Sequence, residues 1–162
     1  GGSLIGFWLA SYVLARGASP TRMAWFGALV GVPAFGAIIA AAQGGGVGVF
    51  TIAVLFAGFG AGLFGHGTLT ATMRNAPPEQ VGLALGAWGA VQATCAGIAV
   101  AVGGVIRDMI LVGGATSAQA PYVPVFALEM AFLIFAVIAI WPLKKRLGQK
   151  LSRNSQQEAY VS

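Results

Sequence analysis

Apolar and polar positions divide the chain into five apolar segments separated by short polar or glycine-rich breaks. Four segments are long enough to cross a bilayer as helices, because a span needs about 20 apolar residues at a rise of about 1.5 Å each. These four cover residues 23–42, 49–73, 81–106 and 122–141. The remaining segment, 4–15, is about half a span, and we expect it to be the end of a helix whose start is missing.

This pattern predicts an all-α membrane protein with about five transmembrane helices. Residues 1–142 would form the helical bundle and residues 143–162 a basic tail. Two glycines four residues apart place bare backbone one turn apart on the same helix face, where another helix can approach closely. Such pairs occur in three different segments, at Gly27/Gly31, Gly58/Gly62 and Gly82/Gly86. They favour a tightly packed bundle over independent anchors.

Composition supports a membrane protein, since 57% of the 162 residues are hydrophobic and 8% are charged, whereas soluble domains carry roughly 25% charged residues. The net charge of +5 does not indicate a nucleic-acid partner, because no basic groove stands clear of the apolar segments. Cys95 is the only cysteine and lies inside an apolar run, which excludes a disulfide framework and a cysteine-based zinc site.

Basic residues predict the orientation through their excess on the cytoplasmic side. With five segments, Arg107 alone falls on one side, and the other eight Lys and Arg residues fall on the side of the C-terminus. The C-terminus is therefore expected in the cytoplasm. In the tail, Leu143, Leu147 and Leu151 recur every four residues among lysines and arginines. This spacing fits a short interfacial helix on anionic lipid, and a solvated basic tail fits it equally well.

Two stretches go beyond generic membrane sequence. Residues 58–73 read G-F-G-A-G-L-F-G-H-G-T-L-T-A-T-M, and residues 83–94 read L-A-L-G-A-W-G-A-V-Q-A-T, followed by G-G-x-x-R-D at 103–108. They resemble the tenth and eleventh helices of the PucC-type proteins, also called the bacteriochlorophyll-delivery family, a branch of the major facilitator superfamily. Residues 1–35 are similar to the eighth and ninth helices of that family.

The resemblance implies the C-terminal part, helices eight to twelve, of a twelve-helix protein in the inner, photosynthetic membrane of bacteria. Its expected function is to assist light-harvesting antenna assembly by handing bacteriochlorophyll to the antenna polypeptides. It could instead be a bound subunit of a reaction-centre antenna complex. The expected partners are these polypeptides or that complex, together with the missing N-terminal helices or a partner chain.

A secondary transporter of small solutes is the alternative function. Residues 15–22 occupy the position of a gating motif, G-x-x-x-D-R-x-G-R-R, that typical transporters of the superfamily carry. No acidic residue occurs there in this chain, which makes an ordinary antiporter less expected without excluding it.

Ionisable groups inside spans are functional candidates, because the bilayer makes them costly. His66 is the only imidazole, and we predict it as an axial ligand or close neighbour of a bacteriochlorophyll magnesium; a packed or pore-lining histidine is the competing interpretation. Glu129 is either a pigment-facing or proton-carrying carboxyl, or one that is neutral or paired within the bundle. Trp88 and Gln92 share a helix stripe with Cys95 and Ala99, which would line a cavity or form a helix contact.

No set of residues for nucleophilic, metal-hydrolytic or nucleotide-dependent catalysis can be assembled from one His, one Cys and no pair of buried carboxylates. We therefore expect a protein that is not an enzyme.

Overall fold

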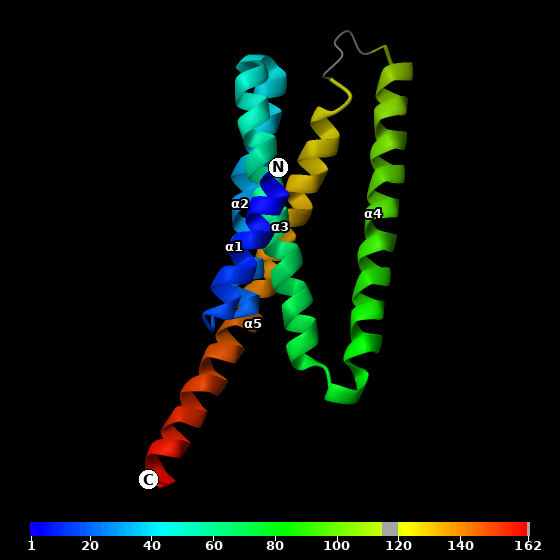
Figure 1. Cartoon of the computed structure of the whole chain (residues 1–162). Coiled ribbons are helices and arrows are strands. Elements are labelled where there is room, and N and C mark those ends of the chain that lie inside the picture. The colour runs from blue at the N-terminus through cyan, green and yellow to red at the C-terminus, as the bar shows by residue number, and fades with distance from the viewer. Residues whose placement is uncertain (115–119, 162) are drawn as a thin grey trace.

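The computed structural model describes residues 1–114 and 120–161, with side chains described as far as Pro142. Within these ranges every regular element is helical, which confirms the all-α prediction (Figure 1). The α-helices are α1 (Gly2–Ala15), α2 (Pro20–Ala40), α3 (Gly46–Asn75), α4 (Val81–Val112) and α5 (Val123–Val161). A π-helical turn, η1 (Ala41–Gly45), joins α2 to α3, and a 3-10 turn, η2 (Pro78–Gln80), precedes α4.

Among the described residues, three helical stretches are long and apolar enough to cross a membrane: Pro20–Asn75, Pro78–Val112 and Val123–Pro142. The first stretch contains two helices, because the chain reverses at Gly44 and Gly46, whose φ angles are 128° and 77°. Residues with a side chain rarely adopt these angles, so glycine is required here. Figure 1 shows the result, an antiparallel pair of α2 and α3 with the turn at one end. α1, with 14 residues, is shorter than a span.

The core lies where α1 and α2 pack against α3 through glycine backbone. A Cβ added to Gly27 of α2 would lie 2.5 Å from the Phe64 nitrogen and 2.6 Å from the Gly60 oxygen of α3. A Cβ on Gly62 would meet the Ser3 oxygen and lie 2.8 Å from the Phe7 nitrogen of α1. Glycine at these positions lets the helices approach to backbone contact, as the spacing of the first two pairs predicts.

Apolar side chains complete this core. Ala10, Leu14, Met23 and Leu63 form a buried cluster at the junction of α1, α2 and α3. α5 also packs against α2, where the Phe35 and Phe126 rings lie 6.2 Å apart. These contacts make α1, α2, α3 and the first turns of α5 one packed unit.

α4 stands apart from this unit (Figure 1). None of its residues is buried, and residues 90–102 are all exposed. A Cβ on Gly82 or Gly86 would meet nothing within 4 Å, so within the described residues the third glycine pair makes none of the close helix contact that its spacing predicts.

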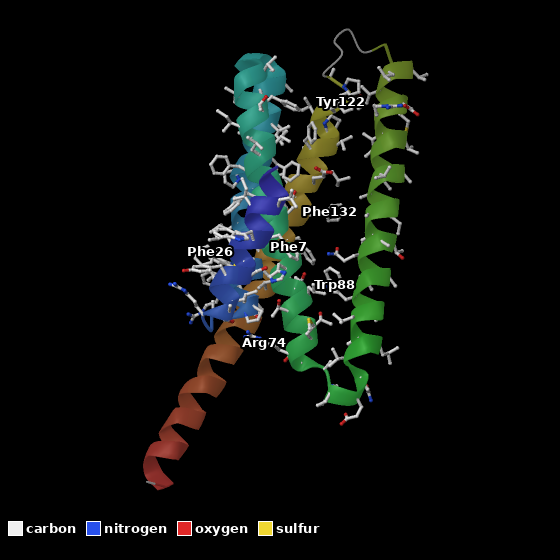
Figure 2. All side chains as sticks on the ribbon, viewed as in Figure 1. Phe7, Phe26, Arg74, Trp88, Tyr122 and Phe132 are labelled. Carbon is white, nitrogen blue, oxygen red and sulfur yellow. The ribbon has the colours of Figure 1, made fainter. Side chains whose placement is uncertain are left out.

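Helix ends fall close to the expected positions, with two differences. α4 continues to Val112, so Arg107 lies within the helix rather than at its end. α5 runs without a break through Pro142 to Val161, past the expected junction of bundle and tail at 142/143. Arg74 lies at the end of the molecule from which α5 extends, and Arg107 belongs to the opposite end of α4 (Figure 2).

Candidate functional site

His66 lies on the face of α3 that packs against α1. Its Nε2 is 3.2 Å from the Ser11 hydroxyl, and its ring meets the Phe7 ring edge-on with centroids 4.2 Å apart. The same α3 face carries Gly62, one turn earlier, whose missing side chain lets α1 approach closely. The structure thus places His66 in a helix contact, which is the competing interpretation of this residue from the sequence.

The Ser11 hydroxyl lies between the Phe7 carbonyl and the His66 ring. The Ser11 hydroxyl lies 3.0 Å from the Phe7 carbonyl oxygen, which can only accept, so it donates its single proton there. With that proton donated to Phe7, Ser11 can accept a hydrogen bond from the Nε2–H of His66. Nδ1 is buried and has no hydrogen-bond partner among the described residues.

Trp88 lies on the side of α4 that faces α3. Its indole Nε1–H donates to the Thr68 hydroxyl at 3.4 Å, and Figure 2 shows the side chain reaching from α4 toward α3. Near the other end of α4, a Cβ on Gly103 would lie 3.3 Å from the Val125 side chain of α5. α4 therefore touches the packed unit at two points about 22 Å apart along its axis.

Between these contacts lie Gln92, Cys95 and Ala99, which we call the open face of α4. Gln92 is one turn after Trp88 and Ala99 one turn before Gly103, so all three residues point to the side on which α4 touches α3 and α5. All three are exposed, and within the described part of the chain Gln92 has no hydrogen-bond partner.

Across from the open face, α5 presents Glu129 and Phe132, four and seven residues after Val125. Phe132 is 64% exposed and points toward α4 in Figure 2. Glu129 is half-buried, and the structure gives its carboxyl no hydrogen-bond partner among the described residues. Trp88 and Gln92 thus lie on the side of α4 that faces α3 and α5, and His66 lies on the face of α3 that contacts α1.

Polar groups at the far end of α4 form a separate cluster. Arg107 forms an ion pair with Asp108, its neighbour in the chain, with 2.7 Å between Nη2 and Oδ1. Both side chains are exposed, so the pair fits an interfacial anchor, which adds little stability.

A cavity of about 810 Å³ lies beside the turn that joins α2 to α3. Gln43, Phe50, Tyr122 and Phe126 are among its lining residues. Sequence reasoning missed this cavity, and it also missed the contacts of Ser11 with His66 and of Thr68 with Trp88. Each hydroxyl bonds a carbonyl of its own helix, and only the close approach of α1 to α3 and of α4 to α3 adds the partner from the other helix.

The described residues do not form a complete pigment site. One ring nitrogen of His66 bonds Ser11 and the other is buried, so neither is presented to a magnesium ion. Gln92 and Glu129 carry oxygen atoms, which magnesium prefers, but the Gln92 side chain is exposed and the Glu129 side chain only half-buried. No cluster of three His, Cys, Asp or Glu residues that could hold a metal ion occurs in the described ranges. The pigment-contacting roles of His66, Trp88, Gln92 and Glu129 stay predictions.

Comparisons with known proteins identify the family. A family model described as PUCC protein matches residues 1–147. The chain is 59% identical over 146 residues to Protein PucC of Cereibacter sphaeroides, covering 88% of the chain and 32% of that protein. Protein PucC of Rhodovulum sulfidophilum is 57% identical over 124 residues, with 75% of the chain and 27% of the relative covered.

Protein PucC of Rhodobacter capsulatus is 48% identical over 153 residues, with 91% of the chain and 33% of the relative covered. The chain therefore spans about a third of the length of these curated relatives. No solved structure matches it. Because the family model covers most of the chain and identities reach 59% over 146 residues, this membrane protein belongs to the PucC protein family.

Proposed function

We propose that this chain takes part in assembling the light-harvesting antenna complexes of photosynthetic bacteria, in the inner membrane and with its C-terminus in the cytoplasm. The observation that carries the proposal is the match to the PucC family over residues 1–147. The apolar helices support a membrane location, and the basic residues at one end of the bundle support the orientation. The twelve-helix arrangement of the major facilitator superfamily belongs to the same proposal.

Pigment delivery is the more specific part of the proposal. Bacteriochlorophyll is large, flat and insoluble in water, so a protein that hands it to antenna polypeptides must bind it from within the bilayer. A mostly exposed apolar helix such as α4 is consistent with a protein that completes its packing with other membrane components. Non-enzymatic action fits the same picture, since binding and release need no catalytic group.

The test uses the natural protein in photosynthetic cells. We expect deletion of its gene to lower antenna absorbance per cell, and complementation with the natural sequence to restore it. We also expect the protein purified in mild detergent to carry far-red absorbance. A deletion strain with unchanged antenna spectra would overturn the proposal.

A second outcome separates assembly from transport. A colourless protein that is stabilised by a small solute, from a strain with normal antenna content, would favour the secondary transporter. Loss of antenna with a colourless protein would retain the assembly function and remove pigment delivery.

A further inference from the structure

We infer that one face of α1 is a binding site for an anionic phospholipid, in which Arg16 binds the phosphate and Tyr12 and Trp8 contact the glycerol and acyl part. The three side chains follow one another at intervals of four residues, so they share one face of the helix. We call this face the aromatic ladder. The inference is independent of the proposed function, because it involves neither pigment nor antenna polypeptides.

The first support is the order within the aromatic ladder. The Trp8 and Tyr12 rings are nearly parallel, with 11° between their planes and 6.1 Å between their centroids. The Arg16 guanidinium carbon lies 4.4 Å from the centroid of the Tyr12 ring, within the range of a cation–π interaction. Each side chain therefore orients the next, and the cation is held at the end of a flat apolar surface.

The second support is the exposure of this surface. The opposite face of α1 packs on α3, where Ala10 is fully buried and a Cβ on Gly6 would meet the Phe59 backbone. Trp8 is two residues from both Gly6 and Ala10, so it points away from α3. Trp8 is 69% and Tyr12 47% exposed. Within the described part of the chain, the aromatic ladder therefore faces the surroundings of the protein.

The third support is the charge of Arg16. Among the described residues its side chain forms no ion pair and no hydrogen bond, and residues 15–22 contain no acidic residue. α1 ends at the end of the packed unit from which α5 extends, where Arg74 also lies (Figures 1 and 2). A guanidinium carries five N–H donors and binds phosphate through two of them at once. The ligand that complements this end of the ladder is therefore a phosphate group.

The order of groups along α1 identifies the ligand as a lipid. Arg16 caps the helix end, Tyr12 and Trp8 lie about 6 and 12 Å farther along the axis, and Leu4, 76% exposed, follows. A phospholipid presents its phosphate, glycerol esters and acyl chains in the same order. The Tyr12 hydroxyl has no hydrogen-bond partner within the described ranges and can donate to an ester oxygen. Free phosphate would leave the two rings and Leu4 without a contact.

The chain offers a matched pair of arginines for the test. Arg22 is exposed in the first turns of α2 and, among the described residues, has no aromatic partner. Arg16→Gln and Arg22→Gln therefore remove the same charge, but only the first changes the aromatic ladder. The natural full-length protein is titrated in mild detergent with phosphatidylglycerol or with phosphatidylcholine of identical acyl chains, and native mass spectrometry gives the affinity for the first bound lipid.

We expect the natural sequence to bind phosphatidylglycerol more tightly than phosphatidylcholine. Arg16→Gln should weaken phosphatidylglycerol binding about fivefold, as for the loss of one cation near an anionic surface. Tyr12→Leu should also weaken it, and Arg22→Gln should have a clearly smaller effect than Arg16→Gln. Equal losses for the two arginine variants would show general electrostatic attraction and overturn the inference. Equal affinity for the two lipids, or equally strong competition by water-soluble glycerophosphoglycerol, would also overturn it.

A second measurement needs no substitution, in case the variants fail to fold. Phosphatidylglycerol with a diazirine in its acyl chain is added to the natural full-length protein, which is irradiated and digested with trypsin. We expect crosslinks in the peptide that ends at Arg16, and we expect excess phosphatidylglycerol to remove them while excess phosphatidylcholine does not. Equal removal by both lipids would refute the site. Absence of crosslinks from residues 4–16 would show that protein covers this face and would refute it as well.

Discussion

Adding one methyl group at Gly27 should separate α2 from α3. A Cβ at this position would lie 2.5 Å from the Phe64 nitrogen and 2.6 Å from the Gly60 oxygen, about 1 Å closer than an ordinary non-bonded contact. Both atoms belong to the backbone of α3, so no side chain can rotate away. The two helices must move apart, which costs about 1–3 kcal/mol by analogy with overpacked cores.

Gly97→Ala is the matched control for Gly27→Ala. A Cβ on Gly97, in α4, meets nothing within 4 Å. Both variants gain the same helix propensity, up to about 1 kcal/mol for Gly→Ala. The difference between them therefore isolates the packing cost and should amount to about a 5- to 140-fold change in the unfolding equilibrium, since about 1.4 kcal/mol corresponds to a factor of ten.

The assay is SDS titration of the purified protein in mixed micelles, followed by tryptophan fluorescence. We expect the unfolding midpoint of Gly27→Ala at a lower SDS mole fraction than that of Gly97→Ala. Equal midpoints for the two variants would refute the close packing of α2 on α3 through glycine.

Three further predictions concern the α1–α3 contact, the topology and the isolated chain. Ser11→Ala and His66→Leu should each destabilise the protein by about 0.5–1.5 kcal/mol, and the double variant by no more than the larger single effect. Pigment content that falls in His66→Leu but not in Ser11→Ala would instead assign His66 as a ligand. A cysteine at Lys150 should be blocked to impermeant reagents from the periplasm and one at Thr116 reached; the reverse would overturn the orientation. Residues 1–162 expressed alone should be unstable or need a partner, which a monodisperse stable monomer would contradict.

Hydrophobicity predicted the number and position of the helices because each span must satisfy its backbone internally, whatever its neighbours are. Glycine spacing predicted the contacts at Gly27 and Gly62, since close approach requires bare backbone. The same spacing could not predict that Gly82 would stay uncovered among the described residues. Two glycines four residues apart indicate that another helix can pack closely there, but they do not indicate which helix does so.

The candidate site could likewise be predicted only in part from the sequence. The stripe of Trp88 and Gln92 follows from helix periodicity, so its shared face could be predicted. The hydrogen bond between Ser11 and His66 depends on how α1 crosses α3, and no local sequence pattern encodes that crossing. Placement of the tail relative to a membrane lies outside what the structure describes and stays a prediction.

The glycine turn between α2 and α3 has a consequence for biogenesis. Its five-residue π-helical segment joins two helices of 21 and 30 residues that contact each other along their length. Contacts between neighbours in the chain close small loops and form early, so the two helices can enter the bilayer together as a hairpin. α4 has fewer such contacts, with Trp88 on Thr68 of α3 among them, so it would join later, and the interval between the two events is when another membrane component has access to its uncovered side.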